Sequence, residues 1–144
     1  MSPEPQTCQP LVVHIDDNAG DLELVQTAVE DCCGPLADYR GVNDGEQALK
    51  VLATLAQPGS PAISLILVDL NIPRVNGWEI VRFIQSKPIL LHVPLVMLSG
   101  SQSSRDIEQA QKTGVVFRTK PTTFTGLSRL VCEFLKGGDW KAQA

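Results

Sequence analysis

The chain of 144 residues contains one stretch that is apolar at almost every position, Ile63-Ser64-Leu65-Ile66-Leu67-Val68, followed directly by Asp69. A strand with one face in water alternates apolar and polar side chains, whereas a strand covered on both faces is apolar throughout. Strands of the second kind are typical of parallel sheets flanked by helices. The stretch therefore predicts the central strand of an α/β fold.

Shorter apolar runs and helical patterns alternate on both sides of this stretch. Further strands are expected at 11–15, 37–42, 93–98 and 115–118. Amphipathic helices are expected at 22–32, 43–55, 77–87, 103–113 and 123–136. Asn43 and Glu46 fit a capping box at the start of the second helix. This order predicts a doubly wound parallel sheet of five strands with five helices.

Length and composition limit the classes of function. The chain has room for one domain, which we expect at 11–137, between a flexible N-terminal lead-in at 1–10 and a short C-terminal tail at 138–144. The formal net charge is −4 and Lys/Arg residues form no cluster, so nucleic-acid binding is not expected. No apolar run is long enough to cross a membrane, and the N-terminus does not resemble a signal peptide. We expect a cytoplasmic, stand-alone module.

The cysteines and histidines carry no metal-binding pattern. Cys8, Cys32, Cys33 and Cys132 show no C-x-x-C spacing, and free thiols in the cytoplasm are the expected state. His14 falls on an apolar, strand-like stretch and is interpreted as a packed or surface histidine rather than a ligand.

Polar residues stand at the ends of four predicted strands. Asp16 and Asp17 follow the first strand, Asp69 the third, Ser99 the fourth and Lys120 the fifth. Right-handed crossovers place the carboxyl ends of parallel strands on one edge of the sheet, where such sheets bind ligands. We therefore expect these five side chains to lie in one site, although more than a hundred residues separate the first from the last.

This set of side chains suits phosphoryl transfer. Converging carboxylates repel one another unless a cation joins them, and oxygen ligands of this kind suit Mg²⁺. Lys120 can neutralise phosphoryl charge, and the hydroxyl of Ser99 can donate a hydrogen bond to a phosphoryl oxygen. Asp69 is the expected nucleophile, because it ends the most buried strand and an aspartate can form an acyl phosphate.

The chain resembles the response-regulator receiver domains of two-component phosphorelay systems over residues 11–136. The resemblance rests on the acidic pair Asp16-Asp17, the segment D-L-N-I-P-R-V-N-G at 69–77, Ser99, and the pair Lys120-Pro121. It implies a flavodoxin-like, CheY-like fold and Mg²⁺-dependent phosphorylation of Asp69.

The resemblance also implies roles for further residues. The backbone carbonyl of Asn71 would join Asp16, Asp17 and Asp69 as a metal ligand. Pro73 and Gly77 would shape the loop after Asp69, and a cis bond before Pro121 would aim Lys120 into the site. Ser99 and Phe117 would form the switch that changes partner binding on phosphorylation. Gly100, where alanine is commoner, and Phe117, where tyrosine is commoner, depart from the family pattern.

The resemblance implies partners as well. The donor would be a sensor histidine kinase or a histidine phosphotransfer protein, and a downstream protein would read the switched state. Residues 71–78, N-I-P-R-V-N-G-W, resemble stand-alone regulators paired with phytochrome-type histidine kinases. Trp140 and the apolar face of the last helix could support a homodimer.

Two alternatives to the switch remain open at this point. The chain could act as a phosphorelay intermediate or phosphate sink without an effector. A phosphohydrolase with an aspartyl-phosphate intermediate is disfavoured, because such enzymes resembling haloacid dehalogenases carry an acid where this chain has Asn71. We accordingly expect a protein that catalyses only its own phosphorylation and dephosphorylation, and not an enzyme.

Overall fold

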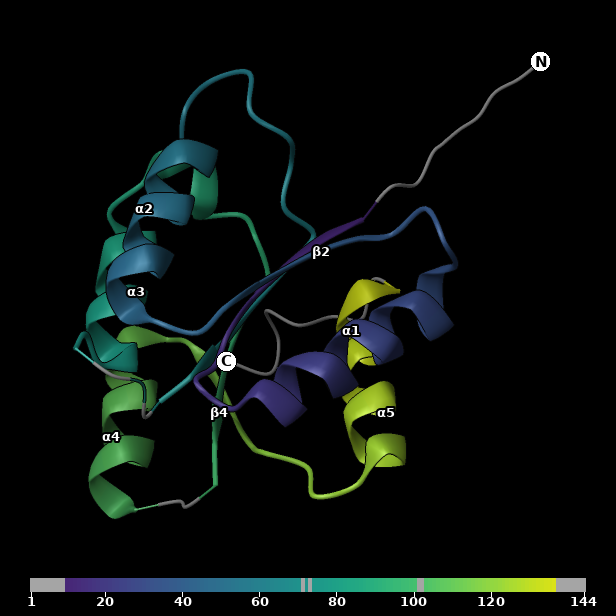
Figure 1. The fold of residues 1–144 in the computed structure, drawn as a ribbon. Helices are drawn as coiled ribbons and strands as arrows, with labels where there is room; N and C mark the ends of the chain where they lie inside the picture. Colours follow the sequence, from purple (N-terminus) through teal and green to yellow (C-terminus); the bar gives the residue numbers. More distant parts are fainter. Residues whose placement is uncertain (1–9, 71, 73, 101–102, 137–144) are drawn as a thin grey trace.

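A five-stranded parallel sheet forms the middle layer of the fold (Figure 1). The computed structural model describes residues 10–70, 72, 74–100 and 103–136. The strands are β1 (Leu11–Ile15), β2 (Asp38–Val42), β3 (Leu65–Asp69), β4 (Leu95–Ser99) and β5 (Val116–Thr119). Their order in the sheet is β2-β1-β3-β4-β5, so β3 is the central strand, as its apolar sequence predicts.

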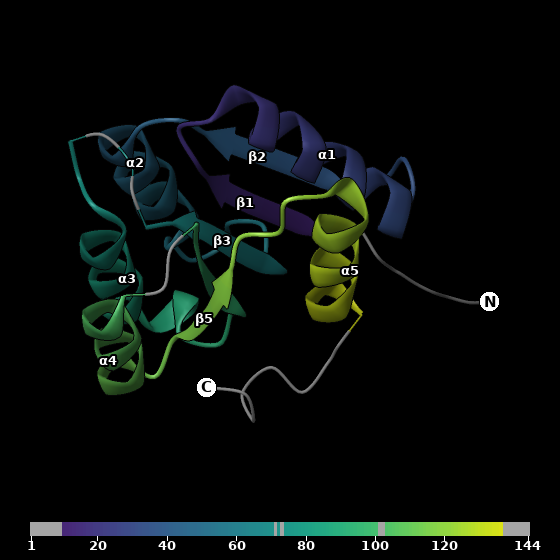
Figure 2. The same ribbon diagram turned by 90° about the horizontal axis from the view of Figure 1, so that it is seen from below.

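Five helices cover the two faces of the sheet. They are α1 (Ala19–Cys33), α2 (Gly45–Leu55), α3 (Gly77–Gln85), α4 (Ser104–Thr113) and α5 (Phe124–Leu135). Helices α1 and α5 lie side by side on one face, and α2, α3 and α4 lie on the other, as Figures 1 and 2 show. The doubly wound fold predicted from the sequence is therefore confirmed.

The alternation of side chains along each strand divides the core into two parts. On β1, Leu11, Val13 and Ile15 pack with residues of α2 and α3. Val12, between them, packs with residues of α1 and α5. Because successive side chains on a strand point to opposite faces, His14 lies on the same side as Val12 and faces α1 and α5. All five positions of β1 are buried.

Some element boundaries differ from those expected. The third and fourth strands begin at Leu65 and Leu95, two residues later than their apolar runs, and a 3₁₀ turn η1 (Pro88–Leu90) follows α3. The cap of α2 is Asp44 rather than Asn43: an Asp44 carboxylate oxygen accepts a 2.7 Å hydrogen bond from the Glu46 N–H. The expected capping box is wrong because the helix begins one residue later and leaves Asn43 outside it.

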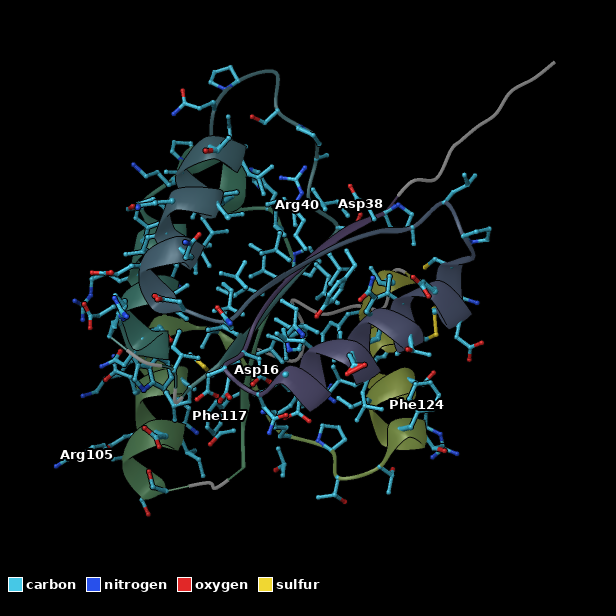
Figure 3. The ribbon with its side chains drawn as sticks, viewed as in Figure 1. Asp16, Asp38, Arg40, Arg105, Phe117 and Phe124 are labelled. Atoms are coloured by element: carbon cyan, nitrogen blue, oxygen red, sulfur yellow. A yellow bond between two sulfur atoms is a disulfide. The ribbon has the colours of Figure 1, made fainter. Side chains whose placement is uncertain are left out.

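A disulfide joins α1 to α5. It links Cys32 and Cys132, whose Cα atoms are 5.8 Å apart, and it appears as a yellow bond in Figure 3. The expectation of free thiols is wrong for this pair. Their sequence separation of 100 residues gives no hint of pairing, which arises because α1 and α5 pack against each other.

Some predictions fall largely or wholly outside the described residues. The lead-in is described only at its last residue, and the tail with Trp140 is not described. Among the helices that are described, none combines the length and the hydropathy needed to cross a bilayer.

Candidate functional site

Three carboxylates meet where β1 and β3 end. The two strands pair in register with Ile15 opposite Val68, so the next residues, Asp16 and Asp69, leave the sheet side by side. Oxygen atoms of Asp16, Asp17 and Asp69 all lie within 4.8 Å of one another. Asp16 is fully buried and Asp69 nearly so, whereas Asp17 is exposed. Figure 3 shows Asp16 where β1 passes into α1.

Lys120 reaches the same carboxylates from the end of β5. Its Nζ lies 2.8 Å from Asp16 Oδ2 and donates a 3.2 Å hydrogen bond to Asp69 Oδ2. The Lys120 backbone N–H donates a 2.8 Å hydrogen bond to the carbonyl of Ser99, the buried last residue of β4. The topology thus brings together Asp16, Asp17, Asp69, Ser99 and Lys120, the five strand-end residues predicted from the sequence.

Asp21 also belongs to this site, although the sequence reasoning missed it. Its Oδ2 lies 2.8 Å from Lys120 Nζ. Asp21 lies in the first turn of α1, where Asn18 caps the helix by accepting a 3.0 Å hydrogen bond from the Asp21 N–H. The spacing N-x-x-D before an apolar helix pattern marks such a turn, but it does not reveal that the carboxylate points back toward Lys120.

The surroundings of Asp16 stabilise its charge. Burial by itself would raise the pKa of this carboxyl group. Contacts with His14 and Lys120, together with a 2.9 Å hydrogen bond from the Asn18 backbone N–H to Oδ1, outweigh burial and hold its pKa well below the ordinary range. Asp16 therefore remains an anion at neutral pH, as a metal ligand must.

Lys120 is stabilised as a cation by the same carboxylates. Burial alone would lower the pKa of its ammonium group, but contacts with Asp16 and Asp21 outweigh burial, and the nearby charge of Asp69 adds to them. The net effect raises the pKa of Lys120 well above its ordinary value. The site thus keeps a permanent positive charge next to Asp69.

A buried polar chain runs from Asp16 toward β2. His14 Nε2 lies 3.4 Å from Asp16 Oδ2, and His14 Nδ1 lies 2.8 Å from the hydroxyl of Tyr39. The same hydroxyl lies 3.0 Å from the carbonyl oxygen of Leu22 in α1. Burial and the negative charge of Asp16 raise the pKa of Tyr39, so its hydroxyl stays protonated. His14 is buried and packed, which is one of the two states, packed or at the surface, that were expected for it.

Two other predicted residues have clear local surroundings. Gly77 begins α3 so close to the end of β3 that a Cβ there would lie 2.9 Å from the carbonyl oxygen of Asp69. The half-buried ring of Phe117 in β5 stacks on Trp78 of α3, with ring centres 6.2 Å apart. Trp78 Nε1 donates a 3.4 Å hydrogen bond to Asp106 of α4, so one contact chain joins β5, α3 and α4.

Of the remaining predicted site features, two residues lie outside the part of the chain that the structure describes, and one prediction is wrong. Asn71 and Pro73 fall outside the described residues. Among the described residues no peptide bond is cis, so the predicted cis bond before Pro121 is wrong. An X–Pro bond favours trans by about 0.5–1 kcal/mol. Lys120 reaches both Asp16 and Asp69 with the trans bond, so its position does not require the cis form.

The donor set fits a hard divalent cation. Carboxylate oxygens are the ligands that Mg²⁺ and related ions prefer, and three of them converge here. Asp16 Oδ2 is buried and, although Lys120 lies at ion-pair distance, it accepts no well-aligned hydrogen bond. A buried anionic oxygen of this kind is suited to direct coordination. Asp16, Asp17 and Asp69 are therefore the residues that could hold the ion.

Comparison with known proteins identifies the family. The sequence matches the family model for the response regulator receiver domain over residues 12–131. This chain belongs to that family. Receiver domains take part in two-component signalling, and the arrangement of carboxylates, serine and lysine is the candidate functional site of this receiver domain.

Several proteins resemble this receiver domain over most of their length. The response regulator Rcp1 of Synechocystis sp. is 29% identical over 128 residues, which cover 84% of this chain and 83% of Rcp1. The phosphorylated cyanobacterial phytochrome response regulator RcpA is 30% identical in a structural match with a TM-score of 0.75, covering 95% of this chain and 97% of that one. The Mn²⁺-bound form of Rcp1 matches at 27% identity with a TM-score of 0.68, covering 85% and 89%.

Proposed function

We propose that Asp69 accepts a phosphoryl group from a phosphohistidine in a Mg²⁺-dependent reaction, and that the receiver domain then changes its binding to a downstream protein. The convergence of Asp16, Asp17 and Asp69 with Lys120 supports this proposal most strongly, because it supplies a nucleophile, a candidate metal site and a fixed cation together. The resemblance to a phosphorylated response regulator, RcpA, points the same way.

Each residue would have a distinct role in the transfer. Asp69 would attack the phosphorus, forming an acyl phosphate while the histidine nitrogen leaves. Lys120, already hydrogen-bonded to Asp69, would neutralise the charge on the phosphoryl oxygens. Mg²⁺ held by Asp16, Asp17, Asp69 and the Asn71 carbonyl would stabilise further negative charge during transfer. The Mn²⁺-bound form of Rcp1 supports a divalent ion here.

The switch would act through Ser99 and Phe117. Ser99 is fully buried at the end of β4, and its hydroxyl would move to donate a hydrogen bond to a phosphoryl oxygen. Phe117 lies two positions before Thr119, which pairs with Ser99 in the sheet. Movement of Ser99 would leave space for the Phe117 ring, which would separate it from Trp78. The surface around β5 would then change its shape for a partner.

The phosphoryl donor would be a sensor histidine kinase or a histidine phosphotransfer protein. Receiver domains of this kind are phosphorylated by histidine kinases, and phytochrome response regulators are among the proteins similar to this chain. A phytochrome-type kinase is therefore the first donor to test. We place its docking site beside the N-terminal end of α1, near Asn18 and Leu22, and around Lys120-Pro121. A cytoplasmic location and a homodimer stay predictions.

The first experiment measures phosphorylation of the purified chain by phosphoramidate or acetyl phosphate, with and without Mg²⁺, by intact-protein mass spectrometry. We expect one labile phosphoryl group that requires Mg²⁺ and is absent from Asp69→Asn. Asp31→Asn, the same change at an exposed site on α1, is the matched control and should be phosphorylated like the wild type. A folded wild type that takes up no phosphoryl group would overturn the proposal.

Two further readouts separate the switch from its alternatives. In a Trp140→Phe background, Trp78 is the remaining tryptophan, and a switch predicts a change in its fluorescence on phosphorylation because its stacking with Phe117 is lost. A relay or sink would be phosphorylated without this change. Turnover of added phosphate esters would instead indicate a phosphohydrolase, and we expect none.

A further inference from the structure

We infer that His14 is a positioning residue for the metal site: its imidazole holds the Asp16 carboxylate in the orientation that binds a divalent cation. The inference rests on the proposed metal site and adds a residue outside the family pattern described above. His14 itself would not touch the metal or the phosphoryl group.

The burial of His14 requires an explanation. Its side chain is 1% exposed, and the other four residues of β1 are all aliphatic. Burying a polar ring in such a place is unfavourable unless its nitrogen atoms have partners. Nδ1 has one in Tyr39, at 2.8 Å. Nε2 makes no well-aligned hydrogen bond, and the group it faces, at 3.4 Å, is Asp16 Oδ2.

The hydrogen positions follow from the partners. If the Tyr39 hydroxyl donates to Nδ1, a neutral imidazole carries its hydrogen on Nε2. If the hydroxyl instead donates to the Leu22 carbonyl, Nδ1–H donates to the hydroxyl. A hydrogen on Nε2 makes its contact with the buried carboxylate attractive, whereas a bare lone pair there would be repelled. An Nε2–H directed toward Asp16 Oδ2 is therefore the favourable arrangement for this 3.4 Å contact.

This contact completes the restraint on Asp16. The Asn18 backbone N–H holds Oδ1 at 2.9 Å, and His14 Nε2 faces Oδ2, the other oxygen of the carboxylate, at 3.4 Å. Lys120 also lies at Oδ2, but its ammonium is a cation on a flexible side chain and a bound metal ion would repel it. His14 is fixed by its strand and by Tyr39, so it can keep Asp16 in place when Lys120 moves away.

The test measures binding of Mn²⁺ and Mg²⁺ to the full chain by isothermal titration calorimetry. His14→Leu fills the space without a donor, and His14→Gln restores an N–H at the end of the side chain. Removing an outer partner of a metal ligand typically costs 10–100-fold in affinity. We expect His14→Leu to bind Mn²⁺ about tenfold or more weakly than the wild type, and His14→Gln to recover most of that loss.

Tyr39→Phe gives a graded comparison, because it releases Nδ1 but leaves Nε2 opposite Asp16. We expect a smaller loss of affinity than in His14→Leu. Thermal unfolding without metal verifies that each variant is folded.

Two results would overturn the inference: wild-type affinity in folded His14→Leu, or equal losses in His14→Leu and His14→Gln, which would indicate altered packing alone. If the wild type binds neither ion, the proposed metal site itself fails, and this outcome is distinct from the other two.

Discussion

Lys120 and Asp21 form an ion pair, with Lys120 Nζ 2.8 Å from Asp21 Oδ2. The two residues are 99 positions apart in the sequence, and neither side chain is more than 27% exposed. The pair ties the loop after β5 to the first turn of α1, beside the three clustered carboxylates. It also shows that Lys120 divides its contacts among Asp16, Asp21 and Asp69.

Replacing Asp21 tests the strength of this tie. We expect Asp21→Asn to lower the free energy of unfolding by about 1 kcal/mol, at the upper end for partly exposed pairs. Urea denaturation at neutral pH without divalent ions measures the change. Arg74→Gln breaks the ion pairs of Arg74, which is 65% exposed, with Asp44 and Glu46, and should cost less than about 0.5 kcal/mol. Equal losses in both variants would contradict this ranking.

Lys120 should compete with a divalent cation. Its ammonium group lies 2.8 Å from Asp16 and 3.2 Å from Asp69. A divalent cation bound by these carboxylates is therefore repelled by the positive charge of Lys120. We expect Lys120→Met to bind Mg²⁺ roughly tenfold more tightly than the wild type in calorimetric titration. Lys112→Met makes the same chemical change at an exposed site on α4 and should leave the affinity unchanged. A weaker affinity in Lys120→Met would refute the competition.

Tyr39 should make the fold sensitive to alkaline pH. Burial and the charge of Asp16 raise its folded-state pKa above the ordinary value near 10. Its contribution to stability is therefore complete below pH 10 and is lost as the pH rises from 10 toward the folded pKa, because only the unfolded state releases the proton. Each pH unit in this window costs at most about 1.4 kcal/mol.

Tyr39→Phe removes this contribution. We expect the wild type to lose about 1 kcal/mol more stability than the variant between pH 8 and 11 in urea denaturation. Lys120 also has a raised pKa, but it is present in both proteins and its effect cancels in the difference. Tyr39 is the only tyrosine, so tyrosinate absorbance reports its titration directly. Tyrosinate appearing at the ordinary pKa in the folded wild type would rule out this account.

The Cys32–Cys132 disulfide should stabilise the packing of α1 on α5. It closes a long loop, and such crosslinks typically contribute about 2–4 kcal/mol. We expect a thiol-free reductant to lower the free energy of unfolding by this amount in urea denaturation. Cys132→Ala should have the stability of the reduced wild type and should not respond to reductant, whereas Cys33→Ala should respond. Thiols in the cytoplasm are usually reduced, so the predicted cytoplasmic location would favour the reduced form of this pair over the disulfide.

Gly77 should tolerate no side chain. A Cβ would lie 2.9 Å from both the Asp69 carbonyl oxygen and the Leu70 Cα, and backbone cannot yield easily. We expect Gly77→Ala to cost about 1–3 kcal/mol in stability and to slow phosphorylation by phosphoramidate, because it displaces the backbone of Asp69. Gly100→Ala adds the same methyl group where nothing lies within 4 Å and should be nearly neutral. A cost as large in Gly100→Ala would contradict the steric explanation.

The pattern of the chain was sufficient to predict the sheet and the convergence of five strand-end residues at the candidate site. The run at 63–68 predicted a central strand, and β3 occupies that position. Asp16, Asp17, Asp69, Ser99 and Lys120 were predicted to meet because parallel strands end on one edge, and this rule does not depend on side-chain detail. The start of α2 was misplaced by one residue because adjacent Asn43 and Asp44 both suit a cap, and sequence alone does not choose between them.

The sequence by itself determined the order of elements and the chemistry at the strand ends, because periodicity and strand direction are local properties of the chain. Only the tertiary structure decided which side chains meet across elements. Asp21 pairs with Lys120, Cys32 with Cys132, and His14 lies between Tyr39 and Asp16. These contacts depend on how α1 packs against the sheet and α5. The spacing of residues in the sequence does not encode the distances between these side chains in space.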